Sequence, residues 1–432
     1  MKVYVETYGC QMNFSDSEVV GGILLSGGLT VTDDPAEADG ILINTCAVRE
    51  HAESKIYRRL EELRPLKAER PDLVIGVLGC LAQDRKKDLL EESGAVDFLV
   101  GPDAYRMLPD LLLSGARNGR RIETGLSKTE TYTDIPPLRR SGVNGWVTIM
   151  RGCDNFCTFC VVPYTRGRER SRDPESVIDE VRALVERGFP QVTLLGQNVN
   201  SYHHGAHRFA DLLAAVCRVE GIERVRFTSP HPKDFPGALL RVMAEEPAAA
   251  PHIHLPLQSA SDDVLERMNR GYTYGEYRLL VDRIRSALPG VALTTDLIAG
   301  FPGEREEDFR ATLRAMREIR FHSAFTFAYS ERRHTRAARR FTDDVPAPVK
   351  RERLRLLSLE ERALSAEILE GEVGRDVEVL VESRSRKSAA EAFGRTPQGS
   401  GVVFPSPEIV PGERATVRIE QATTHTLIGR RI

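Results

Sequence analysis

The sequence predicts an α/β protein built from three parts in series. Residues 1–116 alternate strand and helix patterns, as expected for a parallel sheet covered by helices. Residues 143–370 hold six more strand–helix units, two short of a complete eight-stranded barrel, so we expect a partial (β/α)6 barrel. Residues 371–432 alternate apolar and polar side chains between Pro and Gly residues, which predicts a small antiparallel β-barrel.

The first part shows a regular succession of elements. A capping-box pattern at Ser15–Glu18 predicts a helix that begins there and ends at Gly27-Gly28. Further helices are expected over about 49–63 and 83–92 and from Pro102, and the strands are expected at 3–7, 40–44, 73–78 and 97–100. Residues 117–142 are polar and contain Pro136-Pro137, so we predict a linker.

The second and third parts are equally regular. The barrel strands are expected at 146–150, 192–195, 225–228, 252–255, 292–297 and 323–329. Helices lie between them, for example over 174–187 and 304–319, and a charged helix over about 348–369 closes the barrel region. In the last part we expect strands at 377–381, 401–404 and 415–419.

Composition excludes several classes of protein. The 432 residues are 41% hydrophobic and 28% charged, which excludes a disordered chain and a disulfide mini-scaffold. The net charge of −3 excludes a general attraction to nucleic acid, so any basic patch must be local. No apolar run can span a bilayer and the N-terminus has no secretory signal, so we expect a cytoplasmic protein without a membrane partner. Seven cysteines in such a chain argue against a disulfide framework.

Three cysteines follow the first barrel strand. Cys153, Cys157 and Cys160 have C-x3-C-x2-C spacing, and three thiolates can hold three corners of one cubane iron–sulfur cluster. A structural zinc knuckle is the alternative, but zinc normally takes a fourth protein ligand and none follows nearby. Ferredoxin spacing differs and supplies a fourth cysteine. One iron would therefore lack a protein ligand, and an open metal position is typical of a catalytic site.

Three other cysteines are dispersed. Cys10, Cys46 and Cys80 each lie just past the end of a predicted strand, and the carboxyl ends of parallel strands face one crevice. They could therefore meet in space, or they could be three separate buried apolar residues; geometry alone leaves both readings open. Cys217 lies in an apolar helical segment and is expected to be a core residue.

The cysteine loop, with the aromatic Phe159 before its last cysteine, resembles the radical S-adenosylmethionine (SAM) superfamily. With the dispersed cysteines and the C-terminal barrel, the whole chain resembles the methylthiotransferase family of radical SAM enzymes. The resemblance implies two [4Fe–4S] clusters, one on each cysteine triad, each with one open iron. It also implies SAM at the barrel cluster, with contacts from Phe159, Gln197, Ser229 and Asp296. No catalytic acid–base pair is expected beyond the cluster ligands. The C-terminal barrel resembles a TRAM domain, an RNA-binding module.

Local strings such as Gly9–Asn13 and Leu195–Tyr202 resemble one branch of that family. This branch adds a methylthio group to C2 of N6-isopentenyladenosine at position 37 of tRNA. The alternatives are the same chemistry on ribosomal protein S12 or on threonylcarbamoyladenosine in tRNA, and a non-enzymatic iron–sulfur regulator that binds RNA. The implied partners are a tRNA anticodon stem-loop and a low-potential electron donor such as flavodoxin or ferredoxin, and we expect a monomer.

Two basic stretches follow predicted barrel strands. Residues 332–355 carry nine basic and three acidic side chains, and Arg166, Arg168, Arg170 and Arg172 follow the cysteine loop. Either stretch could be a solvated surface. Both are placed to rim the mouth of the barrel, and arginine suits phosphate, so we expect them to contact the RNA.

Overall fold

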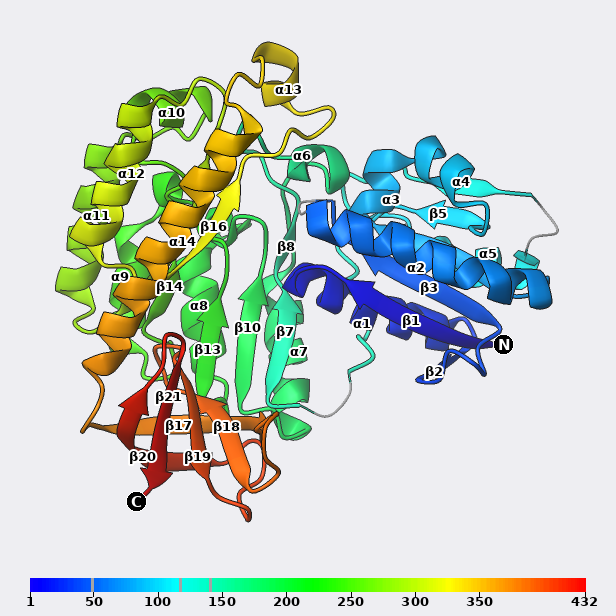
Figure 1. Cartoon of the computed structure of the whole chain (residues 1–432). Coiled ribbons are helices and arrows are strands. Elements are labelled where there is room, and N and C mark those ends of the chain that lie inside the picture. Colours follow the sequence, from blue (N-terminus) through cyan, green and yellow to red (C-terminus); the bar gives the residue numbers. More distant parts are fainter. Residues whose placement is uncertain (48–49, 116–118, 140–141) are drawn as a thin grey trace.

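The computed structural model describes residues 1–47, 50–115, 119–139 and 142–432. A smaller N-terminal lobe lies beside a larger body, and the C-terminal barrel forms the lower end of that body in Figure 1. The expected boundary between residues 116 and 117 lies outside the described residues. No helix in the described ranges combines the length and the apolar character needed to cross a membrane.

The N-terminal lobe contains one sheet of six parallel strands, ordered β2-β1-β3-β4-β5-β6. The strands are β1 (Lys2–Tyr8), β2 (Thr30–Thr32), β3 (Gly40–Thr45), β4 (Val74–Gly79), β5 (Phe98–Val100) and β6 (Arg121–Glu123). The helices are α1 (Gln11–Ser26), α2 (Glu50–Glu69), α3 (Cys80–Arg85), α4 (Lys87–Ser93) and α5 (Leu108–Ser114), with the 3₁₀ turn η1 (Tyr105–Met107). Two separate apolar cores cover the two faces of the sheet, which explains why β3 and β4 are buried along their whole length.

Two features of this lobe differ from expectation. Helix α1 begins at Gln11, so Ser15 and Asp16 lie inside the helix and do not cap it; the expected start at Ser15 is wrong. The hydroxyl of Ser15 instead lies 2.8 Å from that of Thr148 in the barrel, because this face of α1 packs against the larger body. Residues 121–123 of the expected linker form β6, which pairs with β5 and extends the sheet.

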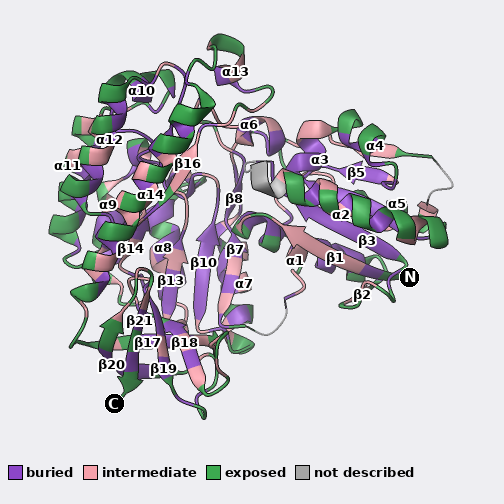
Figure 2. Cartoon of the chain, in the orientation of Figure 1, coloured by how far each residue is buried: buried purple, intermediate pink, exposed green. Residues whose placement is uncertain are grey.

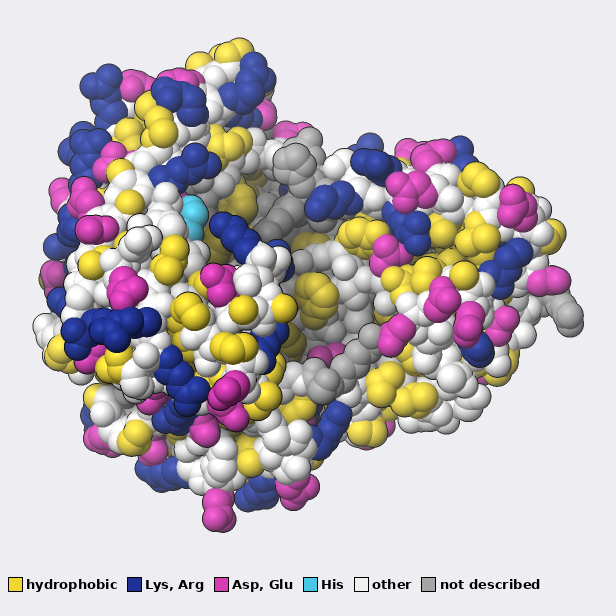
Figure 3. Space-filling view, turned by 60° about the horizontal axis from the view of Figure 1, so that its bottom comes forward, with side chains coloured by type: hydrophobic (Ala, Val, Ile, Leu, Met, Phe, Trp, Pro, Cys, Tyr) yellow, Lys and Arg dark blue, Asp and Glu magenta, His cyan; other side chains and the backbone are white. Residues whose placement is uncertain are grey.

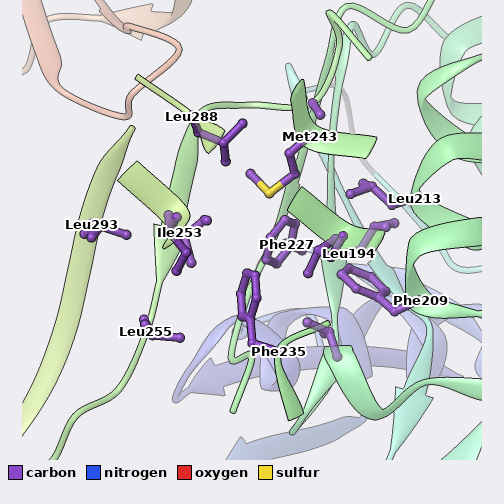
Figure 4. Packing of buried hydrophobic residues seen from close by; sticks show 14 of the residues in the cluster. Leu194, Phe209, Leu213, Phe227, Phe235, Met243, Ile253, Leu255, Leu288 and Leu293 are labelled. Carbon is purple, nitrogen blue, oxygen red and sulfur yellow. The ribbon is translucent and has the colours of Figure 1, made fainter. Parts of the chain in front are cut away.

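Six parallel strands form the partial barrel. They are β7 (Asn144–Thr148), β10 (Gln191–Leu195), β13 (Arg224–Phe227), β14 (His252–His254), β15 (Ala292–Ala299) and β16 (Ser323–Ala328). They run as two three-stranded sheets joined by a bridge between Val225 and Ala249. The sides of the strands that face the helices share the largest apolar core with those helices, and in it Leu194, Phe227 and Ile253 come from three different strands (Figure 4).

Helices cover the outside of the barrel strands, which are mostly buried (Figure 2). The helices are α6 (Val162–Thr165), α7 (Pro174–Glu186), α8 (Phe209–Cys217), α9 (Gly237–Glu245), α10 (Asp262–Arg267), α11 (Tyr274–Ala287), α12 (Glu306–Ile319), α13 (Arg336–Arg340) and α14 (Ala347–Glu370). The short elements are η3 (Val199–Ser201), η4 (Pro232–Asp234), β8 (Met150–Arg151), β9 (Arg170–Ser171), β11 (His203–His204) and β12 (His207–Arg208).

The C-terminal residues form a closed five-stranded barrel in the order β17-β18-β19-β21-β20. Its strands are β17 (Asp376–Arg384), β18 (Glu391–Arg395), β19 (Gly401–Pro405), β20 (Arg414–Ala422) and β21 (Thr426–Arg431), antiparallel except for the β19–β21 pair. It packs against the amino-terminal ends of the large barrel's strands: Arg224 donates to the carbonyl of Arg395 at 3.0 Å, and His322 lies 2.9 Å from Ser400. The carboxyl ends of those strands are left for the functional site.

Helix α1 packs closely on residues 135–138. A Cβ atom at Gly22 would lie 2.2 Å from the carbonyl oxygen of Pro136, although alanine otherwise stabilises a helix by up to about 1 kcal/mol over glycine. We expect Gly22→Ala to lower the free energy of unfolding by about 1–3 kcal/mol, measured by chemical denaturation. The control is Gly237→Ala in α9, where a Cβ would meet no atom within 4 Å. Equal stability of the two variants would contradict this packing.

Candidate active site

The junction between the N-terminal lobe and the barrel is organised around Asp16 of α1. This carboxylate is fully buried and accepts hydrogen bonds from Arg151 at 2.6 Å and from Arg166 at 2.7 Å. Both arginines belong to the barrel and are themselves 2–3% exposed. Burial would raise the pKa of Asp16, but the two guanidinium groups hold it below its usual value. Asp16 is therefore a buried anion that fixes the orientation of α1 against the barrel.

Cys10, Cys46 and Cys80 lie at one edge of the N-terminal sheet. They follow β1, β3 and β4, which are neighbours in the sheet, and the ends of these strands are in register at Tyr8, Thr45 and Gly79. Cys46 is a hydrogen-bond partner of Cys10 and, together with the nearby charge of Arg166, lowers the pKa of the Cys10 thiol to about 6 against the effect of burial. The structure thus brings together the three dispersed cysteines.

Buried backbone and amide contacts fix this edge. Gly79 has a φ of +88°, and a Cβ there would lie 2.6 Å from the carbonyl oxygen of Thr45, so only glycine lets Cys80 approach β3 so closely. Asn13 donates to the carbonyl of Thr45 at 2.9 Å, and Asn44 donates to the carbonyl of Asn13 at 2.9 Å. No structural role was expected for these asparagines, although each lies within three residues of a candidate ligand cysteine.

The second triad lies on the loop after β8. Thr158 pins this loop: its N–H donates to the carbonyl of Met268 at 2.9 Å, and its hydroxyl donates to the carbonyl of Arg267 at 2.8 Å. Arg270 donates to the Cys157 sulfur at 3.3 Å, and Nε2 of His231 lies 4.0 Å from the same sulfur. Burial, followed by the charge of Arg270, lowers the pKa of His231 to about 2, so this imidazole is neutral.

Two thiols of this loop are protonated at neutral pH when no cation is bound. Burial raises the pKa of Cys153 and of Cys160 to about 12, so both are protonated thiols without a cation. No three His, Cys, Asp or Glu side chains of the described ranges converge on a single metal ion. A cubane cluster does not require such convergence, because it presents a different iron atom to each thiolate.

The four residues expected to contact SAM have different surroundings. Both amide atoms of Gln197, just after β10, are buried and lack a hydrogen-bond partner, which is rare without a ligand. Ser229, after β13, has a φ of +59°. Asp296 lies within β15, not at its end, and lies 3.3 Å from Nε2 of His254. Phe159 packs edge-on against Phe301 in a small apolar cluster. Gln197 thus has the free polar atoms that a bound amino acid group needs.

The two cysteine triads adjoin one another across the junction. Cys80 packs with Ala47 and with Val161, the residue after Cys160, so α3 and α6 lie side by side (Figure 1). Figure 3 shows a hollow between the N-terminal lobe and the larger body.

The arginines after the cysteine loop do not rim this hollow as expected. Arg166, Arg170 and Arg172 are buried, and they pair with Asp16, Asp103 and Glu180 respectively. The prediction that these three contact RNA is wrong, because their charges are buried: Arg166 and Arg170 bind carboxylates of the N-terminal lobe, and Arg172 binds a carboxylate within the barrel. Arg168 alone is exposed, at 66%.

The second basic stretch is partly neutralised. Arg353 is buried against Glu304, Lys350 pairs with Asp343, and Arg333 pairs with Asp88 of the N-terminal lobe. On α13, Arg339 and Arg340 are exposed and form no ion pair with any described residue. These two side chains remain free for a phosphate.

Three family descriptions match consecutive parts of the chain. Residues 2–101 match the Uncharacterized protein family UPF0004, residues 147–316 match the Radical SAM superfamily, and residues 370–432 match the TRAM domain.

Relatives match over the full length. A tRNA-2-methylthio-N(6)-dimethylallyladenosine synthase of Porphyromonas gingivalis is 49% identical, with 99% of this chain and 94% of the relative covered. One of Chloroherpeton thalassium is 46% identical, with coverage of 99% and 95%. Among solved structures, the radical SAM methyltransferase TsrM of Kitasatospora setae has a TM-score of 0.61 at 17% identity, covering 78% of this chain and 77% of its own. That likeness shows the fold.

The thiol pKa values lead to a test on the metal-free protein. Cys10 should be a thiolate above about pH 6, whereas Cys153 and Cys160 stay protonated until about pH 12. Alkylation by iodoacetamide, followed by peptide mass spectrometry, should modify Cys10 at pH 7.5 well before the other two, and its rate should fall as the pH drops through 6. Preferential labelling of Cys153 at neutral pH would contradict the arrangement.

Proposed function

The chain belongs to the family of tRNA-2-methylthio-N(6)-dimethylallyladenosine synthases, and from this membership we infer that it is a radical SAM methylthiotransferase acting on tRNA. Its substrate is N6-isopentenyladenosine, and its product carries a methylthio group on C2 of that base. The named full-length relatives support this substrate over ribosomal protein S12 or threonylcarbamoyladenosine. The C2–H bond has no acidic proton, so acid–base groups of the protein cannot activate it. Two iron–sulfur clusters and SAM would supply the radical and the sulfur.

The chain's own residues would hold these groups at one junction. Cys153, Cys157 and Cys160 bind one [4Fe–4S] cluster, and Arg270 offsets thiolate charge at Cys157. The unpartnered amide of Gln197 would bind SAM beside that cluster.

A second [4Fe–4S] cluster is held by Cys10, Cys46 and Cys80. The observation that carries this proposal is the convergence of the three cysteines at one sheet edge, packed against the segment that follows Cys160. Two clusters held by these residues would supply the sulfur and the radical at one junction. The buried ion pairs of Asp16 keep the two triads in place and exclude water from the seam between them.

Two partners complete the proposal. The C-terminal barrel matches the TRAM domain, an RNA-binding module, and with it the exposed arginines of α13 bind an anticodon stem-loop. A one-electron donor of low potential, such as flavodoxin or ferredoxin, reduces the barrel cluster.

Single cysteine variants separate the two clusters. Cys10→Ala should keep SAM cleavage under reductant but abolish methylthiolation, whereas Cys157→Ala should abolish both, because only the barrel triad forms the radical. The measurements are iron content, 5′-deoxyadenosine release and mass spectrometry of tRNA nucleosides. The matched control is Cys217→Ala in α8, a buried thiol remote from both triads, which should keep all three. Full product formation by Cys10→Ala would refute the scheme with two clusters.

RNA binding should depend steeply on salt. For each phosphate contacted on a single strand, the logarithm of the association constant should fall by roughly 0.7 for every tenfold increase in salt concentration. The double variant Arg339→Gln/Arg340→Gln should bind an anticodon stem-loop more weakly and with a shallower salt slope, measured by fluorescence anisotropy. Arg182→Gln, at an exposed arginine of α7 paired with Asp179, serves as the control and should leave the slope unchanged. An unchanged slope in the double variant would remove α13 from the RNA-binding surface.

A further inference from the structure

At the junction around Asp16, two arginines share one carboxylate. One carboxylate, that of Asp16, faces two guanidinium groups, those of Arg151 and Arg166, and all three are buried. Tyr105 also donates to Asp16 but carries no charge. Asp103 and Glu130 supply further negative charge near these arginines, and Arg151 also lies over the ring of Tyr132, whereas the described side-chain hydrogen bonds of Arg166 go to Asp16 alone.

Arg166 also faces the N-terminal triad. Its charge acts to lower the pKa of the Cys80 thiol and of the Cys10 thiol, so the guanidinium lies close to both. Its Nη1 atom is buried and has no acceptor among the described residues, while its Nη2 atom donates to Asp16. An unpartnered buried donor next to two thiols is the arrangement expected where a sulfur-rich anion binds.

The position of Arg166 is fixed by the backbone. It is the C-terminal cap of α6, and its N–H donates to the carbonyl of Val162 at 2.8 Å. The short helix α6 follows Cys160 directly and packs against α3, whose first residue is Cys80. The barrel thus places the guanidinium group of Arg166 beside a cysteine triad that belongs to the N-terminal lobe.

We propose that Arg166 is the counter-charge of the N-terminal cluster: it stabilises the more negative, reduced form and so raises the reduction potential of that cluster, while Asp16 lowers it. The role is that of a positioning residue, and it rests on the proposed function, because it requires a cluster on Cys10, Cys46 and Cys80. Net charge and hydrogen bonds to the sulfurs are established determinants of cluster potential. The couple concerned adds one electron to the cluster from a reductant, and no bond forms or breaks.

The experiment uses the full chain with Cys153, Cys157 and Cys160 replaced by alanine, so that only the N-terminal cluster is observed. Its midpoint potential is measured by dithionite reduction followed by electron paramagnetic resonance, in the presence of redox mediators. Arg166→Gln should shift the potential to a more negative value. Arg166→Lys should restore most of the loss because it keeps the charge, and Asp16→Asn should shift the potential to a more positive value.

The matched control is Arg172→Gln. Arg172 is buried on the same segment, and its described side-chain hydrogen bonds go to Thr148, Glu180 and Ser176, so the cluster potential of this variant should equal that of the parent. Equal shifts in Arg166→Gln and Arg172→Gln, or shifts of the same sign in Arg166→Gln and Asp16→Asn, would overturn the proposal. If Arg166→Gln does not retain the cluster, the direction of the potential shift in Asp16→Asn tests the proposal. A parent chain that binds no cluster would refute the proposed function instead.

Discussion

The carboxylate of Asp16 is the constraint on which the site depends. It lies at the centre of the seam between two structural units, each with its own apolar core, and it binds one arginine before and one after the cysteine loop. Removing one partner from a buried ion pair typically costs about 3–5 kcal/mol, because the other charge is left unpaired in a medium of low polarity. These ion pairs therefore restrict the position of the lobe relative to the barrel more strongly than apolar contacts alone would. Cys10 lies six residues before Asp16, Cys153 lies two residues after Arg151, and Cys160 lies six residues before Arg166.

The placement of the C-terminal barrel leaves the opposite end of the structure free. Arg224 and His322 bind it at the amino-terminal ends of β13 and β16, whereas the cysteine loop and Gln197 follow the carboxyl ends of β8 and β10. An RNA held by the C-terminal barrel must therefore extend along the body to reach the cysteines. The hollow beside the N-terminal lobe in Figure 3 offers such a route.

The sequence was sufficient for the fold class, because strand and helix periods are local signals. It was also sufficient for grouping Cys153, Cys157 and Cys160, whose spacing fixes their proximity. The sequence did not predict the burial of a side chain where that burial depends on a residue far away in the chain. Asp16 has the pattern of an exposed helix cap, and only the packing of α1 on the barrel shows that it is buried. Arg166 likewise has the pattern of a surface arginine, since nothing local reveals a carboxylate 150 positions away.

The segment from Cys160 to Arg166 connects the barrel triad with the N-terminal triad. Its first residue belongs to the barrel triad, its second packs on Cys80, and its last binds Asp16. Any movement that opened the seam would displace a barrel ligand, an apolar neighbour of the N-terminal triad and a buried cation together. Such a movement would break a charge pair and expose apolar surface at the same time, so its cost rises sharply with displacement. A short connection of this kind holds the two cysteine triads at a fixed separation, and neither lobe could provide that separation alone.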